Sequence, residues 1–178
     1  MRKTLSALFR ENGYPESLIY KNVRIHQIYK KIILKECEIK VNILQYRSCP
    51  QQGFRLSIDG GYMQCNNFKS TDFDYWCETT PGSFVVRCKL KKGAENGILY
   101  FKNFWRIKVD SKGLVARWPS DREKIDPFCM TKKDKMMQSW VGNAGILVDE
   151  FPDNVVLRCN SGPTDVTFND LKIKIEFL

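Results

Sequence analysis

The spacing of apolar side chains along the chain changes from helical to alternating from Ile32 onward. Before this point apolar residues recur at intervals of three and four, whereas later segments such as 171–177 (LKIKIEF) place every second side chain on an apolar face. About ten short alternating segments follow, separated by turn residues at intervals of roughly 8 to 12 positions. The pattern predicts a mainly β chain, folded as an antiparallel β-sandwich or jelly-roll-like domain with an N-terminal helical extension.

The N-terminal segment is predicted to contain two helices. Residues 3–12 place their apolar side chains on one helical face, and Gly13 ends that helix. Pro15 suits the first turn of a second helix. The apolar residues of this second helix at helical spacing are Leu18, Ile19 and Val23. We therefore divide the chain into a basic helical extension, residues 1–36, and a β-sandwich domain, residues 37–178.

The longest alternating stretch, residues 98–118, has the sequence ILYFKNFWRIKVDSKGLVARW. The turn residues DSKG at 110–113 divide it into two strands, which predicts a β-hairpin rich in aromatic residues. A sandwich buries one face of each strand against the second sheet. Trp105 and Trp118 are therefore expected to pack in the core.

The net charge of +9 is unevenly distributed along the chain. Residues 1–50 hold 10 Lys and Arg against 4 Glu, whereas residues 51–178 hold 19 against 16 acidic residues. An anionic partner would meet the N-terminal segment first. This suggests an alternative function, a basic protein that associates with nucleic acid through its N-terminal helical segment.

Seven cysteines are present, and no two are closer than eleven positions. This spacing excludes the tight Cys-x-x-Cys pairs of common zinc sites and redox motifs. Positions on strands favour disulfides between the strands of a secreted sandwich, with buried thiols as the alternative. The odd number leaves at least one thiol unpaired, and Cys37, at the boundary of the extension, is expected to be that thiol.

The same cysteine usage favours an extracellular location. The apolar run from Thr4 to Phe9 is, however, too short for a signal peptide. No run of about 18 apolar residues is present, which predicts that the chain has no membrane span.

No catalytic constellation is recognisable, so the chain is predicted not to be an enzyme and to need no cofactor. His26 is the only histidine and is far in sequence from the cysteines, which argues against a Cys-His pair. Gly60-Gly61 lacks the Lys-Ser/Thr and the helix that a phosphate-binding loop requires.

The candidate binding site is a polar segment, residues 69–82, expected to form a loop. It contains Asp72, Phe73, Asp74, Tyr75 and Trp76. Two carboxylates alone supply too few oxygen atoms for a typical Ca²⁺ site. Exposed rings beside carboxylates instead suit sugars, because a ring covers the apolar sugar face while the acid accepts hydroxyl protons. The alternative is that the rings cover the end of the sandwich. The leading hypothesis is a non-enzymatic binding module for a carbohydrate or an extracellular protein, acting through loop aromatics.

Residues 98–142 resemble the farnesoic acid O-methyltransferase-type domain, which is also found in natterin-like proteins. The residues that carry the resemblance are Phe104, Trp105, Gly113, Pro127, Phe128, Trp140, Val141 and Gly142. The turn after Phe104-Trp105 is longer than is usual in that family. The resemblance implies an all-β fold with a ligand-binding role.

Residues 4–23, with the sequence TLSALFRENGYPESLIYKNV, resemble a short stretch of retroelement reverse transcriptases. The stretch contains none of the aspartates with which a polymerase binds its metal ions. It therefore implies no polymerase activity.

Overall fold

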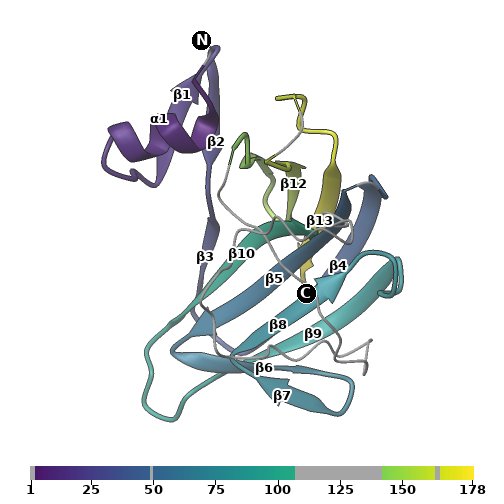
Figure 1. Cartoon of the computed structure of the whole chain (residues 1–178). Helices are drawn as coiled ribbons and strands as arrows, with labels where there is room; N and C mark the ends of the chain where they lie inside the picture. Colours follow the sequence, from purple (N-terminus) through teal and green to yellow (C-terminus); the bar gives the residue numbers. More distant parts are fainter. Residues whose placement is uncertain (1–2, 49, 107–141, 163–164) are drawn as a thin grey trace, which may run out of the picture.

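The computed structural model describes residues 3–48, 50–106, 142–162 and 165–178, and these residues form two antiparallel sheets (Figure 1). The larger sheet contains β1 (Ser17–Tyr20), β2 (Val23–His26), β4 (Cys37–Tyr46), β6 (Gly61–Cys65), β7 (Phe68–Ser70), β9 (Ser83–Leu90), β11 (Gly145–Glu150), β12 (Asn154–Asn160) and β13 (Leu171–Phe177). The smaller sheet contains β3 (Tyr29–Ile33), β5 (Gln51–Asp59), β8 (Asp72–Trp76) and β10 (Gly97–Arg106).

Within these residues the strand order is β1-β2-β11-β12-β13-β4-β9-β6-β7 in the larger sheet and β3-β10-β5-β8 in the smaller one. Both sheets pair antiparallel throughout. The predicted fold class, a mainly β antiparallel sandwich with an N-terminal helical extension, is confirmed.

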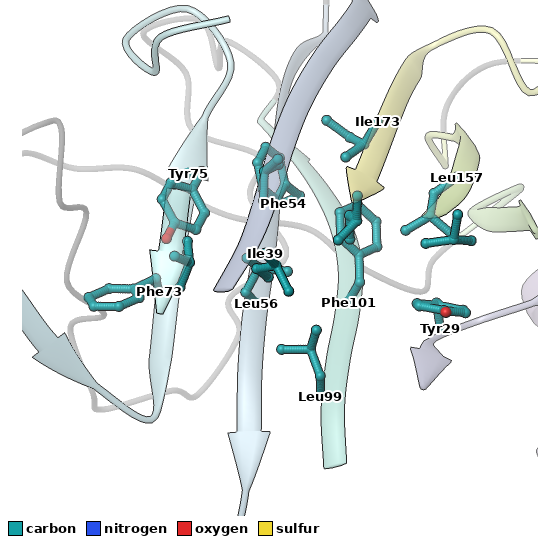
Figure 2. Packing of buried hydrophobic residues seen from close by; sticks show 14 of the residues in the cluster. Tyr29, Ile39, Phe54, Leu56, Phe73, Tyr75, Leu99, Phe101, Leu157 and Ile173 are labelled. Atoms are coloured by element: carbon teal, nitrogen blue, oxygen red, sulfur yellow. The ribbon is translucent and has the colours of Figure 1, made fainter. Parts of the chain in front are cut away.

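The core lies between the two sheets and is rich in aromatic rings (Figure 2). Phe54 of β5 stacks on Tyr75 of β8 at a centroid distance of 5.0 Å and on Phe101 of β10 at 5.4 Å. The larger sheet contributes aliphatic side chains, among them Ile39 and Ile173, which are also fully buried. The alternation that predicted the strands thus places one face of each sheet against the other.

The N-terminal segment contains one helix, α1 (Leu5–Glu11), whose N-terminus is capped by Thr4, since its hydroxyl accepts a hydrogen bond from the backbone N–H of Ala7. The predicted second helix is wrong, because the residues after Pro15 form the β1–β2 hairpin. Lys21 and Asn22, with φ of 49° and 66°, form its two-residue turn. Positive φ at both central residues is the geometry that fits the twist of a hairpin.

The strand β3 belongs to the sandwich. It pairs with β10 from Phe101↔Tyr29 to Gly97↔Ile33, and Tyr29 and Ile33 are buried in the main core. The division of the chain at residue 36 stays a prediction. The pairing of β3 with β10 means that truncated chains can test it.

A second, smaller core lies beneath α1. It consists of Leu5, Phe9, Ile25 and Phe168. Buried Asn160 holds the adjoining loops: its side-chain amide donates to the carbonyl of Asn143 at 2.9 Å, and its Oδ1 accepts from the N–H of Phe168 at 3.1 Å. The helix and the β1–β2 hairpin therefore pack on the end of the sandwich where β11 begins.

The strand β10 confirms the first half of the predicted central hairpin, and the second half lies outside the described residues. Trp105 is fully buried, as predicted, whereas Trp118 lies outside the described residues. Of the residues that carry the resemblance to the farnesoic acid O-methyltransferase-type domain, the structure describes Phe104, Trp105 and Gly142.

Two truncations test where the sandwich begins. A chain starting at Gln27 keeps Tyr29 and Ile33, so we expect cooperative unfolding to be retained. A chain starting at Cys37 loses both core residues and leaves β10 without its neighbour β3, so we expect cooperative unfolding to be lost. The single change Ile33→Ala should lower the free energy of unfolding by about 2–5 kcal/mol.

Urea unfolding, followed by circular dichroism and tryptophan fluorescence, measures these effects. Equal stability of the two truncated chains would show that β3 is dispensable and that the boundary at residue 36 is correct.

Candidate functional site

The segment predicted to be an aromatic loop is the strand β8, so its assignment as a loop was wrong. It pairs with β5 from Gly53↔Trp76 to Ser57↔Asp72. Phe73 and Tyr75 are fully buried in the main core, because the strand places alternate side chains inward. The aspartates between the rings gave the segment a polar composition that concealed this alternation.

The outward residue Asp74 is buried and paired with Arg55. The guanidinium donates twice to the carboxylate, and the Nη2–Oδ2 distance is 2.7 Å. The two side chains are only 12% and 7% exposed. Asp72, at the start of the strand, accepts a hydrogen bond from the Thr71 hydroxyl at 3.1 Å. The Asp74 carboxylate is thus occupied by an intramolecular ion pair instead of facing a ligand.

Trp76 is 4% exposed and packs edge-to-face on Phe104 at a centroid distance of 4.8 Å. The Phe104 ring lies over Gly53, where a Cβ atom would stand 2.2 Å from its Cε2. None of the rings Phe73, Tyr75 and Trp76 presents an open face for stacking on a sugar. The expected exposed platform is therefore absent from the described surface.

The Arg55–Asp74 pair predicts a specific stability effect. Asp74→Asn leaves a buried guanidinium without its counter-charge, which should lower the free energy of unfolding by about 3–5 kcal/mol. The double change Arg55→Met with Asp74→Leu removes both charges and should lower the free energy of unfolding much less. Urea titration of the single and double variants measures this difference, and additive losses would show that the pair is not coupled.

The outer face of the larger sheet carries an excess of positive charge among the described residues. Its register places the outward side chains of β4, β9, β12, β13 and the adjoining strands on one surface. We define the basic face by the charged residues of that surface: Lys40, Lys69, Arg87, Lys89, Arg158, Lys172, Lys174, Glu38, Asp149 and Glu176. Seven cations thus share a sheet face with three carboxylates.

Each carboxylate of the basic face has one cationic partner. The ion pairs are Arg87–Glu38 at 2.6 Å, Arg158–Asp149 at 3.0 Å and Lys174–Glu176 at 2.6 Å. A hydrogen bond from Lys174, followed by the charges of Lys174 and Lys40, lowers the pKa of Glu176. Within the described residues, the cations of the basic face without a carboxylate partner are Lys40, Lys69, Lys89 and Lys172.

Among the side chains that the structure describes, the outer face of the smaller sheet carries equal numbers of cations and acids. The register of β3, β10, β5 and β8 places these six charged residues on it: Lys30, Lys102, Arg55, Asp59, Asp72 and Asp74. Within the described part of the sandwich, the excess of positive charge therefore lies on the outer face of the larger sheet.

Sequence reasoning missed the basic face because it assigned the charge excess to residues 1–50. The signal was present as alternating cations in RCKLK at 87–91 and LKIKIEF at 171–177. Which strands are neighbours, however, depends on the sheet order, which these local patterns do not encode.

The cysteines in the described residues are free thiols, so the expected disulfides are not formed among them. These cysteines are Cys37, Cys65, Cys77, Cys88 and Cys159. Cys49 and Cys129 lie outside the described residues. Burial raises the pKa of Cys65 and raises that of Cys77 to about 12. These buried thiols behave as small core side chains.

His26 lies on β2, where burial, followed by the charge of Arg24, lowers its pKa. No group of three or more His, Cys, Asp or Glu side chains within the described ranges is arranged to hold a metal ion. The helical part of the described chain offers no segment long and apolar enough to cross a bilayer.

Comparisons with family models, curated proteins and solved structures found no match to this chain. The two sequence resemblances stay predictions. The basic face is the candidate functional site.

Proposed function

We propose that this chain is a non-enzymatic binding module for an acidic polysaccharide, which it binds through the basic face. The observation that carries the proposal is the difference between the two outer faces of the sandwich. Among the described side chains, one face has four more cations than acids, and the other has equal numbers. A field of one sign over one face attracts and orients a polyanion.

The strand geometry places the cations of the basic face close together. Neighbouring strands lie about 4.8 Å apart and side chains on one face repeat about every 6.7 Å. Successive cations in the series Lys89, Arg87, Lys40, Lys174 and Lys172 are therefore about 7–8 Å apart, within a Debye length. Lys40 and Lys172 lie on adjacent strands, and Lys89 on the strand beyond Lys40. Sulfate or uronate groups along a flexible glycan can reach several of these cations at once.

The environment of the Tyr62 ring favours a glycan over single-stranded nucleic acid as the ligand of the basic face. Proteins that bind single strands stack bases on open aromatic rings. Tyr62 shares the sheet face with the cations, but the Lys69 ammonium covers its ring at 3.7 Å from the centroid. The face thus offers charge with little surface for base stacking. Nucleic acid, the alternative from the sequence, becomes one outcome of the binding experiment.

The experiment compares heparin, dextran sulfate, an uncharged dextran, and single- and double-stranded oligonucleotides over a range of salt concentrations. Removing Lys40, Lys89 and Lys172 together as Lys→Gln should reduce the slope of log affinity for heparin against log salt by about 2 to 3, because each lost contact removes roughly one unit. The uncharged dextran should not bind.

The matched control removes three exposed cations of the N-terminal segment, as Arg10→Gln, Lys21→Gln and Arg24→Gln. This variant has the same net charge as the first and should bind heparin with nearly the parental slope. Equal losses in both variants would show an unspecific charge effect. A loss confined to the control would favour the N-terminal segment as the binding site, and tighter binding of the oligonucleotides would favour nucleic acid.

A further inference from the structure

Cys37 and Cys88 are direct cross-strand neighbours at one end of the β4–β9 pair. Their backbones are in register, and the following pair, Glu38↔Arg87, forms an ion pair on the outer face. Because side chains alternate along a strand, both thiols point to the opposite, inner face. Directly opposed residues of an antiparallel pair have Cα atoms about 4.5–5.5 Å apart, which lies within the range that a disulfide spans.

The opposed thiols influence each other's protonation. Hydrogen bonding from Cys88, with the charge of Lys35, lowers the pKa of Cys37 to about 7. The same hydrogen bond and burial raise the pKa of Cys88. The pair therefore has one sulfur that is readily a thiolate and one that keeps its proton.

The thiol with the lower pKa is also the more accessible of the two. Cys88 is fully buried, whereas Cys37 is partly exposed and follows the exposed segment 34–36. A small oxidant can therefore reach Cys37 first. Reactive cysteines combine thiolate character with this kind of partial exposure, and a nearby second thiol completes the oxidation.

We propose that Cys37 and Cys88 form a thiol pair that hydroperoxides oxidise reversibly to a cross-strand disulfide. The Cys37 thiolate attacks one oxygen of the hydroperoxide, the O–O bond breaks, and water or an alcohol leaves after taking up a proton. Cys37 is then a sulfenic acid. The Cys88 sulfur attacks the Cys37 sulfur, the S–O bond breaks, and the hydroxyl leaves as water with the Cys88 proton. Two thiols have given two electrons to one hydroperoxide, and a dithiol reductant reverses the change.

This assignment goes beyond the proposed binding function and changes the expectation for Cys37, which the sequence alone marked as the odd thiol. The disulfide would join β4 to β9 across a segment of the chain that includes β5 to β8. It would fix the two strands that carry Lys40, Arg87 and Lys89, at the end of the basic face.

Peptide mapping of the full-length, reduced protein tests the pairing without any variant. After treatment with hydrogen peroxide and blocking of the remaining thiols, trypsin releases Cys37 in ECEIK (36–40) and Cys88 in CK (88–89). We expect these two peptides to appear joined and to separate on reduction with dithiothreitol. Before oxidation, iodoacetamide at pH 7 should label Cys37 about tenfold faster than Cys65 or Cys77, since Cys37, unlike these two, is substantially a thiolate.

Variants check the order of the steps. In Cys88→Ser the first oxidation should stop at the Cys37 sulfenic acid, which dimedone traps, and Cys37→Ser should give no product at Cys88. The proposal is overturned if peptide 36–40 stays unlinked, if it is found only as the sulfinic acid, or if it is joined to the Cys49 peptide (48–55) or the Cys129 peptide (125–132).

Discussion

The packing of the Phe54 ring between the two sheets is the contact on which the architecture depends. Phe54 stacks on Tyr75 and Phe101 of its own sheet, and its centroid lies 6.4 Å from that of Phe84 on the larger sheet. Aromatic side chains bury large areas and dominate the energetics of such cores. The inner faces are therefore mainly apolar. Most charged side chains of the strands lie on the outer faces, and the two sheets differ in the charge that they carry there.

The sandwich end near β11 is held differently, by buried polar groups. The N–H and hydroxyl of Ser161 both donate to the Asp170 carboxylate, at 2.8 and 2.6 Å, and Arg47 lies 3.2 Å from the same group. Asn103 of β10 donates to the carbonyl of Asn160 on β12, which links the smaller sheet to the larger one. Buried hydrogen bonds are directional, so they specify one arrangement of these loops where apolar packing would accept several.

The sequence predicted the fold class and several strands correctly, because alternation is a local property of the chain. It failed where local signals compete. The segment with Leu18, Ile19 and Val23 satisfies a helical spacing, but its β-branched residues and the turn at Lys21 and Asn22 give a hairpin. In β8 the two aspartates suggested a loop, whereas one of them pairs with Arg55, a residue 19 positions away. The basic face was missed for a related reason, since its members come from strands that are distant in sequence.

The contact between Gly53 and Phe104 limits how this chain can diverge. The two residues face each other across β5 and β10, and the ring occupies the space where any other residue at position 53 would place its Cβ. A larger residue at position 53 is therefore acceptable only together with a smaller one at position 104. Among homologous chains these two sites should covary, and this covariation would identify the pairing of the two strands from sequences alone.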